Sequence, residues 1–201
     1  MMKNIVILFL LTFFLACSAN KKIIKTTTIE TEKVEKKKPI RKLAREVTAK
    51  KDASGYLNGI ANKESFQDDS FKGWFNSRQA EYTSDKETIT KLTDALKGYT
   101  IKGFMGTWCG DSKRETPRFY KILEETSFDE NYFELITINR SKKTPDNLQE
   151  GFNIIRVPTF IFYKEGKEVG RYVEYPRETL EKDILKIVTG QAYKHSYDKS
   201  K

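Results

Sequence analysis

Hydrophobic residues along the chain recur with two periods, one typical of helices and the other of strands. Apolar positions three or four residues apart predict helices over residues 84–98, 109–125 and 176–190. Short apolar runs predict strands over residues 99–106, 133–139, 157–164 and 168–174, the last two joined by a turn at Glu165-Gly166. Strands that alternate with helices and end in a hairpin predict an α/β fold, with a mixed central sheet flanked by helices.

Individual residues predict where the helices begin and end. Ser84 is predicted to cap the first helix in a capping box that Glu87 completes, and Gly98 is predicted to end that helix. A short helix is expected to begin at Thr144-Pro145, because proline is favoured at the first helical position. The final helix is expected to open at Pro176.

The first residues have the pattern of an export signal. Lys3 gives a positive start, and residues 5–16 form an apolar run that is too short to span a bilayer. The following Phe14-Leu15-Ala16-Cys17-Ser18 resembles the lipobox of bacterial lipoproteins, although Phe14 stands where leucine is commonest. That resemblance implies that residues 1–17 are a lipoprotein signal segment, with Cys17 as the lipid attachment site. We therefore expect a protein of the bacterial cell envelope, anchored to a membrane on its periplasmic or cell-surface side. The alternative is an ordinary cleaved signal.

The rest of the chain divides by composition. Residues 18–54 are rich in Lys, Thr and Glu and are predicted to be a charged flexible tether. Residues 55–80 are predicted to be a helical extension, with Phe71, Trp74 and Phe75 on one helix face. We expect this helix to pack on the domain, and the alternative is a surface that binds a partner. Residues 81–190 form the main domain, and residues 191–201 form a polar tail whose His195 is expected to be solvated.

The net charge of +9 comes from outside the main domain. Residues 20–51 hold 12 basic and 4 acidic residues, whereas residues 52–193 hold 21 basic and 23 acidic residues. A nucleic-acid-binding domain needs positive charge on its folded face. We therefore expect no nucleic-acid partner. One histidine in a tail leaves no Cys-His or histidine-bearing metal site, the carboxylates look dispersed, and there is no Gly-rich phosphate loop. We therefore expect neither a metal nor a cofactor, with a site made of carboxylates alone as the open alternative.

Three stretches of the main domain resemble one known family. The segment Thr107-Trp108-Cys109-Gly110-Asp111-Ser112-Lys113 resembles the Trp-Cys-Gly-Pro-Cys-Lys site of thioredoxins, and Pro117 falls where their active-site helix carries a proline. Residues 151–160, which contain Val157-Pro158-Thr159, resemble the stretch that leads to the family's cis-proline, and residues 164–167 match the turn that follows. The combination implies a thioredoxin-like fold over roughly the last 110 residues before the tail.

The resemblance implies thiol chemistry at one cysteine. Cys109 would be the nucleophile at a helix N-terminus, where unpaired N–H groups favour the thiolate. Lys113 and Arg114 would add to that effect, and Asp111 would oppose it. Trp108 and the Val157-Pro158 pair, if cis, would bind the substrate.

Two departures from the family limit what carries over. Ser112 replaces the second cysteine, so the site is Cys-Gly-Asp-Ser, and Gly103 stands where the family usually has a buried acid. Without a second sulfur, Cys109 can form a mixed disulfide that only an outside thiol can release. We expect Ser112 to donate a hydrogen bond to the thiolate rather than to resolve the adduct.

Three functions follow from these residues. The first is a monothiol thiol-disulfide oxidoreductase or isomerase, with protein disulfides or thiols as substrates and an external thiol as reductant. The second is a binding or adaptor module that has lost its catalytic power. The third, a dithiol oxidoreductase, requires Cys17 to be free of lipid and able to reach Cys109.

Overall fold

The computed structural model describes residues 41–199, and its centre is a mixed β-sheet. The strands within these residues run in the order β1-β2-β4-β3-β5-β6. Their bounds are β1 Lys50–Lys51, β2 Leu57–Ala61, β3 Tyr99–Met105, β4 Phe133–Thr137, β5 Thr159–Lys164 and β6 Lys167–Val173. The β3 and β4 strands are parallel, and every other neighbouring pair is antiparallel. The predicted α/β class is confirmed.

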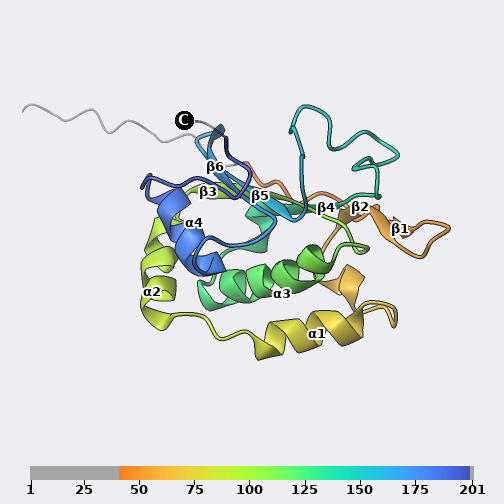
Figure 1. The fold of residues 1–201 in the computed structure, drawn as a ribbon, viewed down its shortest axis with the longest axis horizontal. Helices are drawn as coiled ribbons and strands as arrows, with labels where there is room; N and C mark the ends of the chain where they lie inside the picture. The colour runs from red at the N-terminus through yellow and green to blue at the C-terminus, as the bar shows by residue number, and fades with distance from the viewer. Residues whose placement is uncertain (1–40, 200–201) are drawn as a thin grey trace, which may run out of the picture. The chain divides into compact units, whose positions relative to one another are not determined.

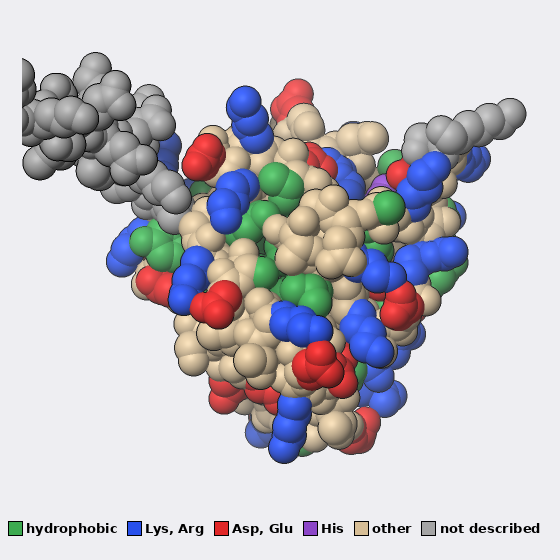
Figure 2. Space-filling model, turned by 90° about the vertical axis from the view of Figure 1, so that its left-hand side faces the viewer, with side chains coloured by type: hydrophobic (Ala, Val, Ile, Leu, Met, Phe, Trp, Pro, Cys, Tyr) green, Lys and Arg blue, Asp and Glu red, His purple; other side chains and the backbone are tan. Residues whose placement is uncertain are grey.

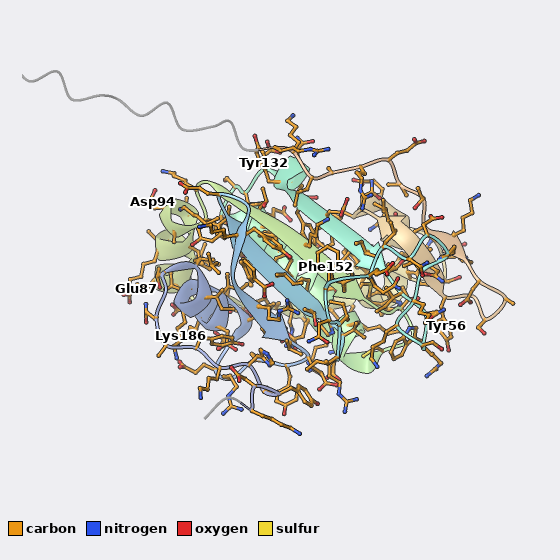
Figure 3. All side chains as sticks on the ribbon, turned by 90° about the horizontal axis from the view of Figure 1, so that it is seen from above. Tyr56, Glu87, Asp94, Tyr132, Phe152 and Lys186 are labelled. Carbon is orange, nitrogen blue, oxygen red and sulfur yellow. The ribbon has the colours of Figure 1, made fainter. Side chains whose placement is uncertain are left out.

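Helices cover one face of this sheet and a long loop lies on the other. The α-helices are α1 Lys72–Glu81, α2 Lys86–Ala95, α3 Gly110–Glu125 and α4 Leu180–Val188. Figure 1 shows all four on the same side of the strands, with the loop of residues 138–158 on the opposite side. Viewed from that side, the ring of Phe152 lies over the middle of the sheet (Figure 3). No helix within residues 41–199 combines the length and hydrophobicity that crossing a bilayer requires.

The core under the helices is built largely from aromatic rings. Phe119 of α3 stacks on Phe160 of β5 with ring centroids 3.9 Å apart, and both side chains are fully buried. On α1, Phe75 is fully buried and stacks on Phe66 at 4.8 Å. The predicted helix is present as α1 and packs on the domain through Phe75, whereas Trp74 is only partly buried.

The sheet begins earlier in the chain than the sequence predicted. Residues 55–80 were expected to be helical, yet β2 lies within them and pairs with β4. Residues 41–54 were expected to belong to a flexible tether, yet β1 pairs with β2, and the amides of Thr48 and Ala49 donate to Ile60 O. These contacts use backbone groups, which leave little sequence signal in a Lys-rich edge strand. The rest of the predicted tether and the signal segment lie outside the described residues.

Other boundaries also needed correction. Asp85, not Ser84, caps α2, because its carboxylate accepts from the Thr88 amide at 2.8 Å. No helix begins at Thr144: its hydroxyl instead accepts from the Leu148 amide at 2.8 Å and holds a turn. The α4 helix begins at Leu180 rather than Pro176, because Asp183 accepts hydrogen bonds from the backbone amides that precede the helix.

The start of the predicted polar tail packs on the domain. Tyr193 donates to the Asp183 carboxylate at 3.2 Å, and Tyr197 donates to the Glu174 carboxylate. His195 is partly buried rather than solvated, and this burial lowers the pKa of its imidazole. Aromatic residues in a short polar segment explain this outcome, since each ring gains apolar contact while its hydroxyl finds a partner.

Candidate functional site

The turn between β3 and α3 places Cys109 at the start of a helix. The Cys109 amide donates to Gly106 O at 2.9 Å, and its carbonyl accepts from the Lys113 amide at 3.0 Å as the first turn of α3 forms. Cys109 has an extended backbone and is the N-cap of α3. Unpaired amides of a helix start carry partial positive charge, so the sulfur lies where an anion is favoured.

The sulfur of Cys109 lies beside the segment predicted to bind substrate. Its Sγ donates to the carbonyl oxygen of Val157 at 3.3 Å, across 48 residues of sequence. The Val157-Pro158 peptide bond is cis. Cys109 is partly exposed, whereas Val157 is only 3% exposed. The two segments singled out by sequence therefore meet at one edge of the molecule, and the thiol is accessible there.

The Ser112 hydroxyl has a different hydrogen-bond partner from the one that the sequence led us to expect. Its side chain is fully buried, and its hydroxyl oxygen accepts from the Gly106 amide at 3.2 Å. Within the described residues no hydrogen bond joins this hydroxyl to Cys109, so the predicted donation to sulfur is wrong for this structure. The reason is that Gly106 ends the preceding strand segment with an amide that needs a partner, and Ser112 supplies it.

Trp108 is fixed in a layer of side chains beside the cysteine. Its indole Nε1–H donates to Ile138 O at 2.8 Å. The guanidinium of Arg140 lies 5.4 Å from the Trp108 ring centre and 5.3 Å from that of Tyr56, and it donates to the Tyr56 hydroxyl at 3.1 Å. Sequence reasoning missed Arg140 and Tyr56, because they come from a loop and from a segment assigned to a helical extension.

The N-terminal strands also support the active-site turn. The Thr107 hydroxyl is buried and accepts from the Leu57 amide of β2 at 3.0 Å. A Cβ on Gly106 would lie 2.5 Å from the Trp108 ring, so only glycine lets the indole pack at this position. The Leu57 contact could not be predicted from sequence patterns, since it joins an amide to a hydroxyl 50 residues away.

Charges on α3 form a network behind the cysteine. Arg114 forms ion pairs with Asp111 at 2.7 Å and with Glu115 at 2.6 Å, and Arg118 reaches Glu115 at 3.1 Å. Glu115 is fully buried, and burial raises the pKa of its carboxyl although the arginines favour the ionised form. Asp111, which the sequence left without a role, is thus the partner of Arg114.

Gly103 is packed too closely to accept the acid that thioredoxins usually have there. A Cβ at Gly103 would lie 2.9 Å from Leu135 Cδ1 and 2.9 Å from Phe133 Cε2. The space for an acidic side chain is therefore filled by two apolar residues. Within residues 41–199, no cluster of His, Cys, Asp and Glu side chains could hold a metal ion. Cys17 lies outside the described residues.

Comparisons with known proteins agree with this geometry. The family model Thioredoxin matches residues 81–186. A thioredoxin-like protein of Acanthamoeba polyphaga mimivirus is 35% identical over 96 residues, which are 48% of this chain and 67% of the viral protein. Human thioredoxin is 27% identical over 106 residues, which are 53% of this chain and 92% of the human protein.

Among solved structures, a Pseudomonas aeruginosa protein of unknown function matches with a TM-score of 0.51. The match is 17% identical and covers 66% of this chain and 94% of that protein, so it supports the fold alone. A thioredoxin domain suggests a redox or thiol-related function. The family model spans more than half of the chain, and the chain therefore belongs to the thioredoxin family.

Proposed function

We propose that this protein is a monothiol thioredoxin-like protein that forms mixed disulfides with protein substrates. The observation that carries the proposal is a partly exposed Cys109 at the start of α3, 3.3 Å from Val157 O, with a buried serine at position 112. The geometry provides an accessible thiol, and Ser112 cannot form the second S–S bond that would release an adduct.

The exchange uses the substrate disulfide as oxidant and an external thiol as reductant. The Cys109 thiolate attacks a substrate disulfide, one new S–S bond forms, and the other half of the substrate leaves as a thiolate. The thiolate of an external thiol then attacks the substrate sulfur of the mixed disulfide, forms a new disulfide with it, and releases Cys109 as a thiolate. In this scheme Trp108 and Val157 position the substrate on either side of the sulfur, and Ser112 fixes the turn through the Gly106 amide.

The proposal extends to where the protein acts. Cleavage before Cys17 and acylation of its sulfur would anchor the protein to a membrane of the bacterial cell envelope, with the domain outside the cytoplasm. Cys109 would then be the single thiol of the mature chain, because the sequence has two cysteines. Mass spectrometry of the mature N-terminus tests this: a lipid-modified Cys17 is expected, and an unmodified Cys17 thiol would contradict it.

A trapping experiment with two matched variants tests the chemistry. The full chain, reduced and held in detergent, is mixed with a neutral aromatic disulfide, and the adduct is located by mass spectrometry. We expect a stable adduct on Cys109 that Cys109→Ser abolishes. We expect Ser112→Cys to release the same adduct at least about tenfold faster without added thiol, because it restores an internal resolving sulfur.

Two outcomes would contradict the proposal. One is a Cys109 that reacts no faster than free cysteine. The other is a Ser112→Cys adduct that persists as long as that of the unmodified chain. Of the aromatic residues that a binding module was expected to use, Phe71 and Phe75 are buried in the core and Trp74 is partly exposed, so most of that surface is not available to a partner.

A further inference from the structure

Three cations on segments next to Cys109, Trp108 and Val157 lie over aromatic rings. Lys113 lies 5.9 Å from the Trp74 ring centre, Arg140 lies 5.4 Å from that of Trp108, and Arg156 lies 5.0 Å from that of Tyr197. Across residues 41–199, none of the three forms a salt bridge, whereas Asp111 is paired with Arg114. Stacking on rings keeps these charges in place without neutralising them.

All three are attached to residues that surround the sulfur. Lys113 is one helical turn from Cys109 and donates its amide to the Cys109 carbonyl. Arg140 stacks on Trp108, the neighbour of Cys109 in sequence. Arg156 directly precedes Val157, whose carbonyl accepts from the thiol. The three charges therefore come from three separate segments of the chain, each of which includes or stacks on a residue next to Cys109 or Val157.

At the opposite end of the molecule, on α2 and around α4, several lysines pair with carboxylates: Lys91 with Glu87, Lys97 with Asp94, and Lys186 with Glu178. Lys164 at that end instead stacks on the Tyr99 ring. Figure 2 looks at this side and shows basic and acidic side chains interspersed. Residues 52–193 hold fewer basic than acidic residues, so the positive charge at Cys109 is local and not a property of the whole domain.

A groove of about 390 Å³ lies between α1 and the first turn of α3 and begins at Gly110, next to the cysteine. Its other lining residues are Trp74, Arg78, Asp111, Lys113 and Arg114. Arg78 pairs with Glu81, and Arg114 pairs with Asp111. The charge of Lys113 is therefore not balanced, and the groove has a net positive charge. A negatively charged peptide segment that enters the groove would meet this ammonium and the indole of Trp74.

We infer that the partner of Cys109 is an acidic peptide segment, with carboxylates flanking the cysteine whose sulfur bonds to Cys109. This inference rests on the proposed function and names its substrate class. Lys113 contacts the acidic flank from the groove, and Arg140 and Arg156 attract it from the other side of the sulfur. Because such charges act mainly on the encounter, the effect is on the rate of adduct formation and depends on salt.

Three peptides that differ only beside their cysteine test the inference. Each carries a 2-thiopyridyl disulfide on a cysteine flanked by Glu, Ser or Lys, and the full chain carries Cys17→Ser. Attack by Cys109 forms the Cys109–peptide disulfide and releases thiopyridone, whose absorbance gives the rate. At low ionic strength we expect the Glu peptide to react about tenfold faster than the Lys peptide, with the ratio falling at high salt.

Matched variants show which residues cause the difference in rate between the Glu and Lys peptides. Lys113→Gln and Arg140→Gln are each expected to lower the Glu/Lys rate ratio two- to threefold, roughly, and together to remove most of it. Lys164→Gln is the control, because Lys164 also stacks on an aromatic ring, 4.5 Å from the Tyr99 ring centre, at the far end of β5. That control is expected to leave the ratio unchanged.

The outcomes separate the two proposals. If the Ser peptide forms the Cys109 adduct and the Glu and Lys peptides react equally fast, the inference is wrong and the proposed function stands. An equal loss of the ratio in Lys164→Gln and Lys113→Gln would also overturn the inference. If no peptide forms the adduct, the proposed function fails, and the inference fails with it.

Discussion

The two faces of the sheet are closed in different ways. Under the helices, large side chains such as Phe119, Phe160 and Tyr172 are fully buried and stack on one another. On the opposite face, the smaller cluster around Phe104 and Ile161 is covered by loop residues that are only partly buried. One face thus resembles a closed core, and the other is a thin apolar layer under a loop.

Both faces bury carboxylates: Glu115 of α3 and Asp183 of α4 are fully buried on the helix side, and Glu134 is buried on the loop-covered face. Glu134 of β4 forms ion pairs with Lys102 of β3 and with Arg45, and its carboxylate is nearly fully buried. A buried carboxylate is tolerated only where partners satisfy it. The faces therefore differ in apolar packing rather than in buried charge. That difference indicates that the helix face supplies most of the stability, while the loop face holds Val157 against the sulfur with fewer apolar contacts.

The largest loss of stability is expected for Phe119→Ala, which tests the helix face. Phe119 contacts rings from β4 and β5, with centroids 5.2 Å from Phe133 and 3.9 Å from Phe160. Its removal leaves a cavity between α3 and the sheet, and we expect the free energy of unfolding to fall by about 3–5 kcal/mol. Urea denaturation measures this loss. A loss below about 1 kcal/mol would show that the aromatic core is not the main source of stability.

The second test is Glu134→Gln, which leaves two cations without their carboxylate. We expect a loss of about 2–3 kcal/mol at neutral pH, because charge-assisted hydrogen bonds in a buried site are removed. Arg45, although itself half exposed, loses the partner that ties residues 41–49 to the sheet. Chemical denaturation measures the loss, and Lys51→Gln, which removes an exposed pair with Asp68, serves as the control.

The same variant predicts a pH dependence with a definite sign. Burial alone would raise the pKa of the Glu134 carboxyl, but hydrogen bonds from Arg45 and Lys102 hold it below its ordinary value. An acid with a lowered pKa in the folded state stabilises the fold above its unfolded pKa, about 4.3, and this stability is lost as the pH falls through the folded pKa. Stability of Glu134→Gln should therefore change less with pH below about 4.3 than that of the unmodified chain. An identical acid profile would contradict the assignment.

Sequence reasoning succeeded where the pattern is local. The apolar stripe of α2 and the hairpin at Glu165-Gly166 follow from residues a few positions apart, and both are present. It failed for β2 and for the contacts of residues 41–49, since those depend on backbone pairing with a distant strand. It also failed at Thr144, where side-chain hydrogen bonds to a turn outweigh the preference of Pro145 for a helix start.

The same division applies to the candidate site. The proximity of Cys109 and Val157 was predictable because the family pattern includes both segments. The partner of the Ser112 hydroxyl was not, since choosing between a sulfur and an amide requires the path of the turn. The stacking of Arg140 between two rings had no signal either, because its partners are 32 and 84 residues away in sequence.

The smallest expected effect concerns the loop itself. Phe152 packs on Phe104 at 5.1 Å and lies under Lys102, and Arg171 donates to its carbonyl at 2.8 Å. Because the ring is only partly buried, Phe152→Ala should cost about 1–2 kcal/mol, less than a fully buried ring. The arginine contact uses the backbone, so it survives the substitution and keeps part of the loop in place.

Hydrogen exchange distinguishes this local change from a general one. In Phe152→Ala, amides of residues 139–157 should exchange faster, while those of α3 keep their protection, because the helix face is untouched. Adduct formation at Cys109 should slow as well, since the loosened loop leads directly into Val157. Equal loss of protection on α3 and the loop would mean that the two faces unfold as one unit. The conclusion that the helix face supplies most of the stability would then be wrong.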